Sequence, residues 1–369
     1  MKLLQIERDA LLLPLQAVTG IVEKRHTLPI LSNVLIERKK ERLNLIATDL
    51  EIQITTSCEA GGKVSEDHSL TVSARKLQDI LRSLPDKSEA TLDLQANKVQ
   101  LKAGKSRFNL QTMPADDFPK MADAGELQAK FSISQKLLQE LLLLVQYAMA
   151  QQDIRYYLNG LLLVLDGSKI KVVATDGHRL SYAEGTLSAS HDKREVILPR
   201  KAVLELSRQL SSGDAEVQIE IYASQVRFRY GNSELVTKII DGKFPDFTRV
   251  IPVNYTKTIT LGRQELLQSL QRAAILSNEK FRGVRWMLTG DSLRVSCTNT
   301  EQEEAQEELE VAYSGEALDV GFNITYLLDV LNNVHTEKID CSFGDANSSM
   351  LITIPGRDDF RYVVMPMRI

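Results

Sequence analysis

One pattern occurs three times in this chain of 369 residues, and it constrains the fold more than any other feature. In each copy an alternating apolar segment ends in Thr followed by Asp or Asn, within the stretches LNLIATDLEIQI, IKVVATDGHRLSY and LRVSCTNTEQEEA. The three threonines, Thr48, Thr175 and Thr298, are spaced by 127 and 123 residues. A chain of this length exceeds what one hydrophobic core usually serves, so the repeat predicts three tandem domains.

Two segments with helical periodicity recur in every copy. The first lies ahead of the alternating segment, at residues 8–24, 134–151 and 263–277. The second segments, VSARKLQDILRSL, LPRKAVLELSRQL and FNITYLLDVLNNV, align without gaps at offsets of 126 and 124 residues, with an acid at Asp79, Glu205 and Asp329. Short alternating strands follow each of them. Every copy is therefore expected to form the series β-α-β-β-β twice.

This order of elements predicts an α+β fold. Strands on both sides of single helices, joined by short hairpin loops such as DGS and YGN, favour antiparallel sheets with helices on one face. We place the three domains at residues 1–127, 128–255 and 256–369.

The composition is that of an ordinary globular protein, with 43% hydrophobic and 25% charged residues. Glu7, Arg8 and Asp9 interrupt the apolar N-terminal segment, so no signal-peptide core forms there, and the apolar runs elsewhere are too short to span a bilayer. We expect a cytoplasmic protein with no membrane partner. The three cysteines form no C-x-x-C pair and the five histidines are scattered singly, so no metal site and no cofactor are expected.

Charge placement favours a polyanionic partner although the formal net charge is −4. The second helical segments of copies one and two, at residues 74–83 and 199–210, each carry three basic residues and one acid. Residues 301–319, in contrast, carry eight acids and no base. Matching basic helices would form one positively charged surface, and a solvated helix face is an equal alternative.

The stretch VATDGHRL, residues 173–180, has the composition of an active-site loop. Asp176 and His178 would be the catalytic pair of a hydrolase, but no G-x-S-x-G or H-E-x-x-H motif supplies a nucleophile or a metal partner. Copies one and three have Asp49 and Asn299 in place of Asp176. The Thr-Asp core is therefore predicted to be a structural turn, with only the GHRL segment special to copy two, and the chain is expected not to be an enzyme.

Several segments are long enough to be specific, namely LPRKAV, VATDGHRLS, AAILSNEKFRGVR, NTEQEEAQE and the C-terminal YVVMPMRI. With these segments and three tandem copies of this length, the chain resembles the bacterial DNA polymerase III β subunit, the sliding clamp, along its whole length. It departs from that family at His26, where proline is common, and at Ile369, where leucine is usual. Neither departure changes the resemblance.

The resemblance implies a head-to-tail homodimer whose six similar domains close a ring around duplex DNA, with helices lining the hole and sheets outside. Such a ring is a processivity factor, because it keeps a polymerase at high effective concentration on its template. It needs no base contacts, and weak contacts to phosphates permit sliding. A monomeric DNA-binding repeat protein is the alternative, and it would leave linear and circular DNA alike.

The implied partners are duplex DNA of any sequence, a second copy of the chain, the DNA polymerase III catalytic subunit, the clamp loader, and other DNA polymerases and repair proteins that carry clamp-binding peptides. Family positions near DNA correspond to Arg25, Arg75, Gln152, Tyr157, Arg200 and Lys201. The implied dimer interface consists of Lys105, Arg107 and Phe108 from one end of the chain and Ile275, Leu276, Glu301, Glu303 and Glu304 from the other. Opposite charges would select the partner end, while the apolar residues supply most of the stability.

The family also binds short peptides, typically a glutamine with leucine and phenylalanine anchors, in an apolar cleft at the join of the second and third domains. The matching residues are Leu158, Thr175, Gly177, His178, Arg179, Leu180, Pro245, Arg249, Val250, Val363, Val364, Met365, Pro366 and Met367. Methionine suits a surface that accepts several partners, and His178 and Arg179 would supply polar edges. On the residues alone, YVVMPM is better explained as a terminal core strand.

Overall fold

The order of helices and strands repeats three times in the computed structural model, which describes residues 2–23, 28–60, 67–122 and 124–368. Copies one and three share the order β-α-β-β-β followed by β-α-β-β-β. In copy two, two long strands take the place of four shorter ones. The predicted α+β architecture of three tandem copies with antiparallel sheets is therefore confirmed.

Contacts divide the chain into two compact units. The first unit contains Met1–Lys136 and Leu204–Ile239, and the second contains Leu137–Val203 and Ile240–Ile369. Copy two thus contributes residues to both units. None of the helices in the described ranges is long and apolar enough to cross a membrane.

The first unit contains one antiparallel sheet of twelve strands. In spatial order the strands are β1 (Lys2–Glu7), β6 (Glu89–Gln95), β7 (Lys98–Ala103), β8 (Ser106–Met113), β5 (His68–Ser73), β2 (Asn33–Lys39), β3 (Arg42–Thr48), β4 (Ile52–Glu59), β14 (Ser233–Lys238), β13 (Gln225–Tyr230), β12 (Glu216–Tyr222) and β9 (Leu127–Ser134). Short turns join neighbours that are consecutive in sequence, such as β2–β3 and β6–β7, and the predicted YGN hairpin connects β13 to β14.

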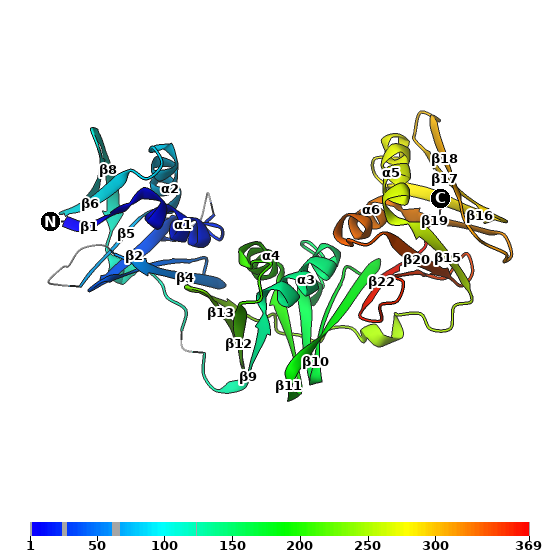
Figure 1. Cartoon of the computed structure of the whole chain (residues 1–369), viewed down its shortest axis with the longest axis horizontal. Helices are drawn as coiled ribbons and strands as arrows, with labels where there is room; N and C mark the ends of the chain where they lie inside the picture. The colour runs from blue at the N-terminus through cyan, green and yellow to red at the C-terminus, as the bar shows by residue number, and fades with distance from the viewer. Residues whose placement is uncertain (1, 24–27, 61–66, 123, 369) are drawn as a thin grey trace. The chain divides into compact units, whose positions relative to one another are not determined.

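Helices cover one face of the strands of copy one, as predicted. Helix α1 (Arg8–Thr19) packs on β3 and β4, α2 (Ala74–Ser83) packs on β2 and β5, and the two helices contact each other (Figure 1). The periodicity of α2 explains its orientation, because Leu77 and Leu81, one turn apart, are fully buried while Arg75 and Arg82 are exposed.

The second unit contains two antiparallel sheets. The six-stranded sheet has the order β10 (Gly160–Thr175), β11 (Arg179–Pro199), β22 (Phe360–Val364), β21 (Met350–Thr353), β20 (Lys338–Phe343) and β15 (Lys257–Gly262). The four-stranded sheet has the order β18 (Glu304–Glu310), β17 (Ser292–Thr298), β16 (Gly283–Thr289) and β19 (Leu318–Asn323). The predicted hairpin loop DGS instead lies inside β10, because β11 continues to pair with β10 on both sides of an irregular register at Gly167.

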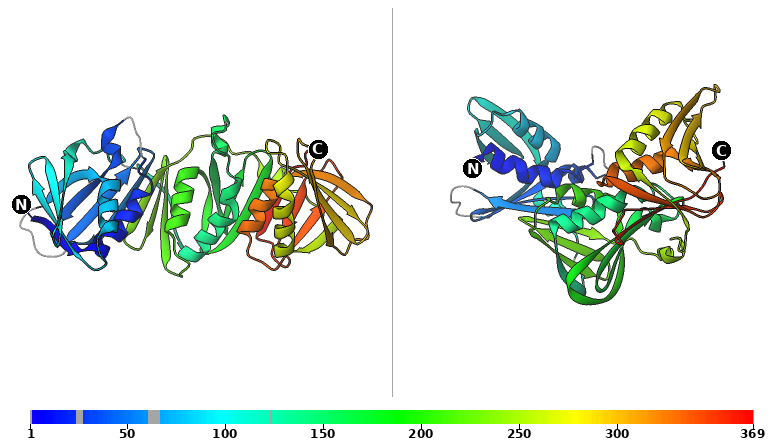
Figure 2. Two further views of the ribbon diagram at one scale, coloured as in Figure 1. Left: turned by 90° about the horizontal axis from the view of Figure 1, so that it is seen from above. Right: turned by 45° about the vertical axis from the view of Figure 1, so that its right-hand side comes forward.

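The remaining helices are α3 (Gln135–Val145), α4 (Arg200–Gln209), α5 (Arg263–Ala273) and α6 (Ile324–Asn333). Helices α5 and α6 lie side by side against the strands of copy three (Figure 2). Asn323 caps the start of helix α6, because its side chain accepts a hydrogen bond from the Thr325 amide at 2.9 Å. The helix buries Ile324, Leu327 and Leu331, so Tyr326 and Asp329 lie on its more exposed side.

Two strand pairings join successive copies, and they have the same register. In the first unit β14 of copy two pairs with β4 of copy one, with Val236 opposite Gln53. In the second unit β22 of copy three pairs with β11 of copy two, with Val363 opposite Leu180. Both residues of the second pair lie 127 positions after those of the first. The corresponding strands β8 and β18 have no such neighbour within the described chain along residues 106–111 and 304–310.

Candidate functional site

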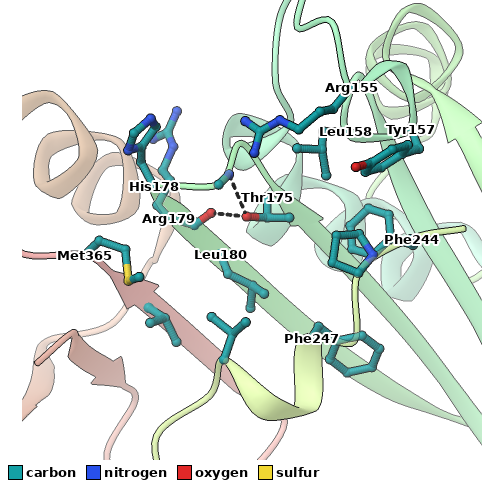
Figure 3. Close-up of a pocket in the computed structure, with 14 residues that line it drawn as sticks. Arg155, Tyr157, Leu158, Thr175, His178, Arg179, Leu180, Phe244, Phe247 and Met365 are labelled. Atoms are coloured by element: carbon teal, nitrogen blue, oxygen red, sulfur yellow. Dashed lines mark hydrogen bonds between the residues drawn. The ribbon is translucent and has the colours of Figure 1, made fainter.

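The segment between β10 and β11 is a tight turn held by its own side chains. The Thr175 hydroxyl donates to the Arg179 carbonyl oxygen at 2.6 Å and accepts from the Gly177 amide at 3.1 Å (Figure 3). The Asp176 carboxylate accepts from the amides of His178 and Arg179 at 2.9 and 3.0 Å. The acid of the suggested catalytic pair therefore stabilises the turn.

Copy one forms the same turn. The Thr48 hydroxyl donates to the Ile52 carbonyl oxygen at 2.8 Å, and the Asp49 carboxylate accepts from the amides two and three residues further on at 2.9 and 2.8 Å. This confirms the prediction of a structural Thr-Asp turn. Leu50 occupies the position of Gly177, with φ of 77° where Gly177 has 89°, so the turn itself tolerates a side chain there.

At Gly177 a neighbouring side chain occupies the space where a Cβ atom would lie. A Cβ atom at this position would lie 2.9 Å from Arg155 Nη1. Arg155 Nη2 donates to the Asp176 carbonyl oxygen at 3.1 Å and to Asp153 Oδ2 at 2.8 Å. The hydrogen bonds from Arg155 lower the pKa of the Asp153 carboxyl to about 2. Arg155 thereby ties the turn to the segment ahead of β10.

An apolar cleft of about 230 Å³ lies beside this turn, in the second unit (Figure 3). Its lining residues are Arg155, Tyr157, Leu158, Thr175, Gly177, His178, Arg179, Leu180, Phe244, Pro245, Phe247, Val250, Val363 and Met365. They come from the short helix Tyr156–Leu158, the ends of β10 and β22, the start of β11, and the segment around the short helix Phe247–Arg249. We call this site the cleft.

The floor of the cleft is part of the hydrophobic core, and its rim is exposed. Leu158, Leu180 and Val363 are at most 2% exposed and belong to one core cluster. Val250 and Met365 on the rim are 39% and 45% exposed. The Met365 amide donates to the His178 carbonyl oxygen at 2.9 Å, so the C-terminal segment is attached to the same turn. An apolar ligand would extend the core outward at this point.

A second, polar cavity of about 590 Å³ lies on the other side of the turn. We call it the polar basin, and it is lined by Tyr147, Met149, Ala150, Gln151, Gln152, Asp153, Asp176, His178, Arg179, Arg200, Tyr326 and Asp329. His178 and Arg179 line both the cleft and the polar basin. The turn is therefore a shared wall.

The structure brings most of the predicted cleft residues together. Ten of the fourteen line the cleft, and the four that do not are Arg249, Val364, Pro366 and Met367. Arg249 is exposed and pairs with Asp246 at 2.9 Å, and Val364 is fully buried. The Met367 amide donates to the Gly321 carbonyl oxygen at 2.8 Å. The C-terminal segment is thus a core strand up to Val364 and part of the cleft rim at Met365.

Sequence reasoning missed Arg155, Phe244 and Phe247 as lining residues and expected Tyr157 near DNA. Phe244 precedes Pro245 in a segment that also occurs in copy one as Phe118-Pro119, so in the sequence it resembles a structural feature of the repeat. Phe247 stacks near Tyr182, with ring centroids 5.8 Å apart, a contact that local sequence does not signal.

The residues expected near DNA come from both units. Gln152 and Arg200 line the polar basin, Lys201 follows on α4, and Arg75 is an exposed residue of the first unit whose guanidinium donates to the Val22 carbonyl oxygen at 2.6 Å. Partial burial lowers the pKa of Arg200, and the nearby Arg179 charge lowers it further. Arg25 and His26 lie outside the described residues, as does Ile369.

The residues expected at the dimer interface are solvent-accessible. Lys105 and Arg107 are exposed, Phe108 is half-buried, and all three lie in or beside the β7–β8 hairpin. Ile275 is 78% exposed directly after α5, next to half-buried Leu276. The three acids, Glu301, Glu303 and Glu304, are exposed at the start of β18.

Three tandem copies of paired helices on antiparallel sheets define the class of DNA clamps. Comparison with known proteins identifies the family within that class. The three domains described as DNA polymerase III beta subunit, N-terminal, central and C-terminal domain, match residues 1–122, 132–246 and 248–368. The chain belongs to the family of DNA polymerase III β subunits, the β sliding clamps.

Relatives and solved structures agree over the whole chain. Proteins named beta sliding clamp from Pseudomonas aeruginosa and Escherichia coli (strain K12) are 46% and 42% identical, with 99% of each chain covered. The crystal structure of the DNA polymerase III subunit beta from P. aeruginosa has a TM-score of 0.95 at 45% identity over 100% of both chains. A P. aeruginosa clamp bound to griselimycin has a TM-score of 0.94 at 45% identity over 99% of both chains.

Members of this family are rings that tether their partners on DNA and are not enzymes. Family membership removes the hydrolase alternative, and it confirms the resemblance seen in the sequence.

Proposed function

We propose that this sliding clamp holds its partners through short peptide segments that bind in the cleft. The observation that carries the proposal is an apolar floor, formed by Leu158, Leu180 and Val363, beneath an exposed apolar rim. Burying a leucine or phenylalanine anchor against such a floor contributes about 1.5–3 kcal/mol per side chain. An exposed patch of this kind is typical of a surface that binds another protein.

The edges of the cleft suit an extended peptide. The Arg155 guanidinium and the exposed His178 side chain provide polar groups at one side, where they would orient the peptide backbone or a glutamine side chain. Met365 has an unbranched, flexible side chain on the rim, which can adapt to different anchors. These features favour several partners that share one peptide pattern.

Two substitutions in one linker test the cleft. Val250 lines the cleft, whereas Val253, three residues further on and 77% exposed, does not. Val250→Glu places a charge on the apolar rim and is expected to weaken binding of a fluorescein-labelled peptide containing glutamine, leucine and phenylalanine more than tenfold. Fluorescence anisotropy measures the dissociation constant.

Val253→Glu is the matched control and is expected to bind the peptide like the unmodified clamp. Both sites are exposed, so neither substitution removes core packing. Equal affinity of the two variants for the peptide would show that the peptide binds elsewhere.

The proteins proposed to carry such peptide segments are the DNA polymerase III catalytic subunit, the clamp loader, other DNA polymerases and repair proteins. We place the clamp and these partners in the cytoplasm, where a bacterial chromosome lies. Gln152 and Arg200 in the polar basin, together with Arg75 and Lys201, are proposed to contact phosphates of duplex DNA without reading its sequence.

The two joins inside the chain suggest how a second copy closes the ring. If β8 of one subunit pairs with β18 of the next in the register of the internal joins, Asn109 lies opposite Glu304 and Phe108 opposite Ala305. At the join in the second unit, Tyr147 and Tyr362 have ring centroids 5.8 Å apart. The residues at the corresponding positions of the repeat are Ile275 and Phe108.

The proposed interface therefore packs Ile275 against Phe108 of the partner subunit. Around this contact, Lys105 and Arg107 of one end would face Glu301, Glu303 and Glu304 of the other. Such complementary charges select the head-to-tail orientation, because two like ends would repel each other. Burial of Ile275, now 78% exposed, supplies apolar stabilisation.

A further inference from the structure

Arg179 lines both the cleft and the polar basin, and its guanidinium lies among residues of the polar basin. Side chains alternate along a strand, so Leu180 faces the floor of the cleft and Arg179 faces α6 (Figure 3). Arg179 is only 9% exposed. Its Nη1 lies 2.5 Å from Asp329 Oδ2, its Nε lies 3.2 Å from Asp176 Oδ2, and its Nη2 donates to the Tyr147 carbonyl oxygen at 2.6 Å.

Two aromatic rings complete the surroundings of Arg179. The guanidinium carbon lies 4.4 Å from the ring centroid of Tyr326 and 5.8 Å from that of Tyr147. Tyr326 and Asp329 are three residues apart on α6 and so share one side of the helix. We call Arg179, Asp176, Asp329, Tyr147 and Tyr326 the clasp. It joins the turn beside the cleft to a helix of copy three.

The clasp is not a general feature of the repeat. The position of Arg179 is occupied in copy one by Ile52, which is 1% exposed. The position of Asp329 is occupied in copy two by Glu205, and Arg208 of the same helix forms an ion pair with that acid. The join in the first unit therefore forms without an arginine at the turn. The fold alone does not explain why the turn of copy two carries one.

The backbone of the turn between β10 and β11 is connected to three parts of the cleft. The Arg179 carbonyl oxygen accepts from the Thr175 hydroxyl, and the His178 carbonyl oxygen accepts from the Met365 amide at 2.9 Å. Leu180 follows directly in β11. A shift of the Arg179 side chain would therefore be transmitted to one wall, the floor and the rim.

We propose that Arg179 is a positioning residue for the cleft: through the clasp, α6 fixes the turn that forms one wall of the cleft. This inference rests on the proposed peptide-binding function. It differs from the expectation drawn from the family, in which Arg179 supplies a polar edge that contacts the peptide. Asp329 does not line the cleft, so its substitution separates the two roles.

The first arm of the test is Asp329→Asn, measured with the same labelled peptide by anisotropy. Loss of the carboxylate leaves the guanidinium with one partner fewer in a mostly buried position, so the turn loses its fixed geometry. Peptide affinity is expected to fall about five- to tenfold. Asp329→Glu, which keeps the carboxylate, is expected to recover part of the loss. If Arg179 only contacts the peptide, Asp329→Asn binds like the unmodified clamp.

The control is Asp319→Asn. Asp319 forms an ion pair with Arg285 at 2.5 Å, also within the second unit, and neither residue lines the cleft; this pair is more exposed than the clasp pair. Its substitution is expected to leave peptide affinity unchanged. A loss equal to that of Asp329→Asn would attribute the effect to general weakening of the unit and overturn the proposal.

A double-mutant cycle adds a readout that a purely structural role would not give. Arg179→Ala and Arg179→Ala combined with Asp329→Ala are expected to bind the peptide with the same affinity, because Asp329 acts only through Arg179. If the double variant binds the peptide more weakly than Arg179→Ala does, Asp329 affects the cleft by another route and the proposal is overturned.

Hydrogen exchange tests the clasp without any peptide. In Asp329→Asn the Met365 amide is expected to exchange faster, whereas amides between β16 and β17 keep their rates. If the unmodified clamp fails to bind the peptide, the cleft proposal fails and exchange alone decides whether the clasp holds the turn. Unchanged exchange at Met365 would overturn the inference even where the peptide binds.

Discussion

At the scale of single residues, Gly177 and Leu50 occupy the same position of one turn but have different surroundings. Both residues have positive φ in the same hydrogen-bonded turn. Only at Gly177 does another side chain, that of Arg155, fill the space where Cβ would lie. The glycine is therefore explained by the close approach of Arg155, which also lines the cleft.

Substitution of this glycine is expected to have two separable effects. In Gly177→Ala the positive φ costs about 1 kcal/mol of stability, and the new methyl group displaces Arg155 from the Asp176 carbonyl oxygen. Urea denaturation is expected to show the lower stability, and anisotropy a peptide affinity reduced several-fold. Gly231→Ala is the control, because Gly231 has φ of 52° but no atom within 4 Å of the added Cβ.

Gly231→Ala is expected to lose similar stability and to keep full peptide affinity. Full affinity in Gly177→Ala as well would show that the position of Arg155 does not matter for binding.

Which residues of the site could be predicted depended on how local their signals are. Leu180 and Val363 belong to long segments that resemble the family, and both line the cleft in the structure. The orientation of Arg179 could not be predicted, because its partner Asp329 lies 150 residues further along the chain. Tyr157 lies next to Tyr156, which is 58% exposed, and sequence does not tell which ring turns toward the cleft.

At the scale of elements, the open edges of β8 and β18, at the positions where the other copies are joined, carry the main consequence. Exposed strand edges bind further strands, and β8 and β18 offer such edges at residues 106–111 and 304–310. The exposed apolar side chain of Ile275 lies close to one of them, since the segment Ala274–Leu276 contacts β18. The open edge of β18, the apolar contact of Ile275 and the opposite charges of the two chain ends would together select a second copy of the chain as the partner.

Replacing Ile275 is expected to open the ring. In Ile275→Glu a charge would be buried against Phe108 of the partner subunit, so the variant is expected to sediment as a folded monomer. Ile154→Glu is the control, because Ile154 is an apolar residue that is 96% exposed and lies elsewhere in the second unit. Dimers of Ile275→Glu as stable as those of the control would contradict the proposed interface.

Helices and hairpins were predictable because their signals are periodic and local. The buried positions of α2 follow the spacing of its leucines, and YGN forms the hairpin between β13 and β14. The DGS segment has similar turn residues but lies inside β10, because pairing with the long strand β11 overrides its local preference. The joins between copies were not predictable, since each pairs strands more than 170 residues apart.

At the scale of the whole molecule, membership of the sliding clamp family means that the function depends on a closed ring. A ring holds DNA because it surrounds the duplex, so strong contacts to phosphates are unnecessary and would slow sliding. The residues proposed to contact phosphates, Arg75, Gln152, Arg200 and Lys201, include only three cations per chain, which suits weak contacts of that kind. The acidic net charge of −4 is compatible with such a role, because binding depends on local charge.

Retention on DNA tests this topology. Clamps loaded onto nicked circular DNA are expected to remain bound through gel filtration at moderate salt and to be lost when the circle is cut with a restriction enzyme. Ile275→Glu is expected to be lost from both forms. A clamp that stays on linear DNA as long as on circular DNA would be a monomeric DNA-binding protein, the alternative that the sequence left open.

The location of the cleft, lined by residues of copies two and three, also sets the valency of the ring. Among the described residues each chain has one such cleft beside the Thr175–Arg179 turn, so a closed homodimer has two. Two proteins can then be attached to one ring at once, each through its own peptide. One bound protein can then replace the other at the DNA end while both remain attached to the ring. The order of exchange depends on their relative peptide affinities instead of on diffusion from solution.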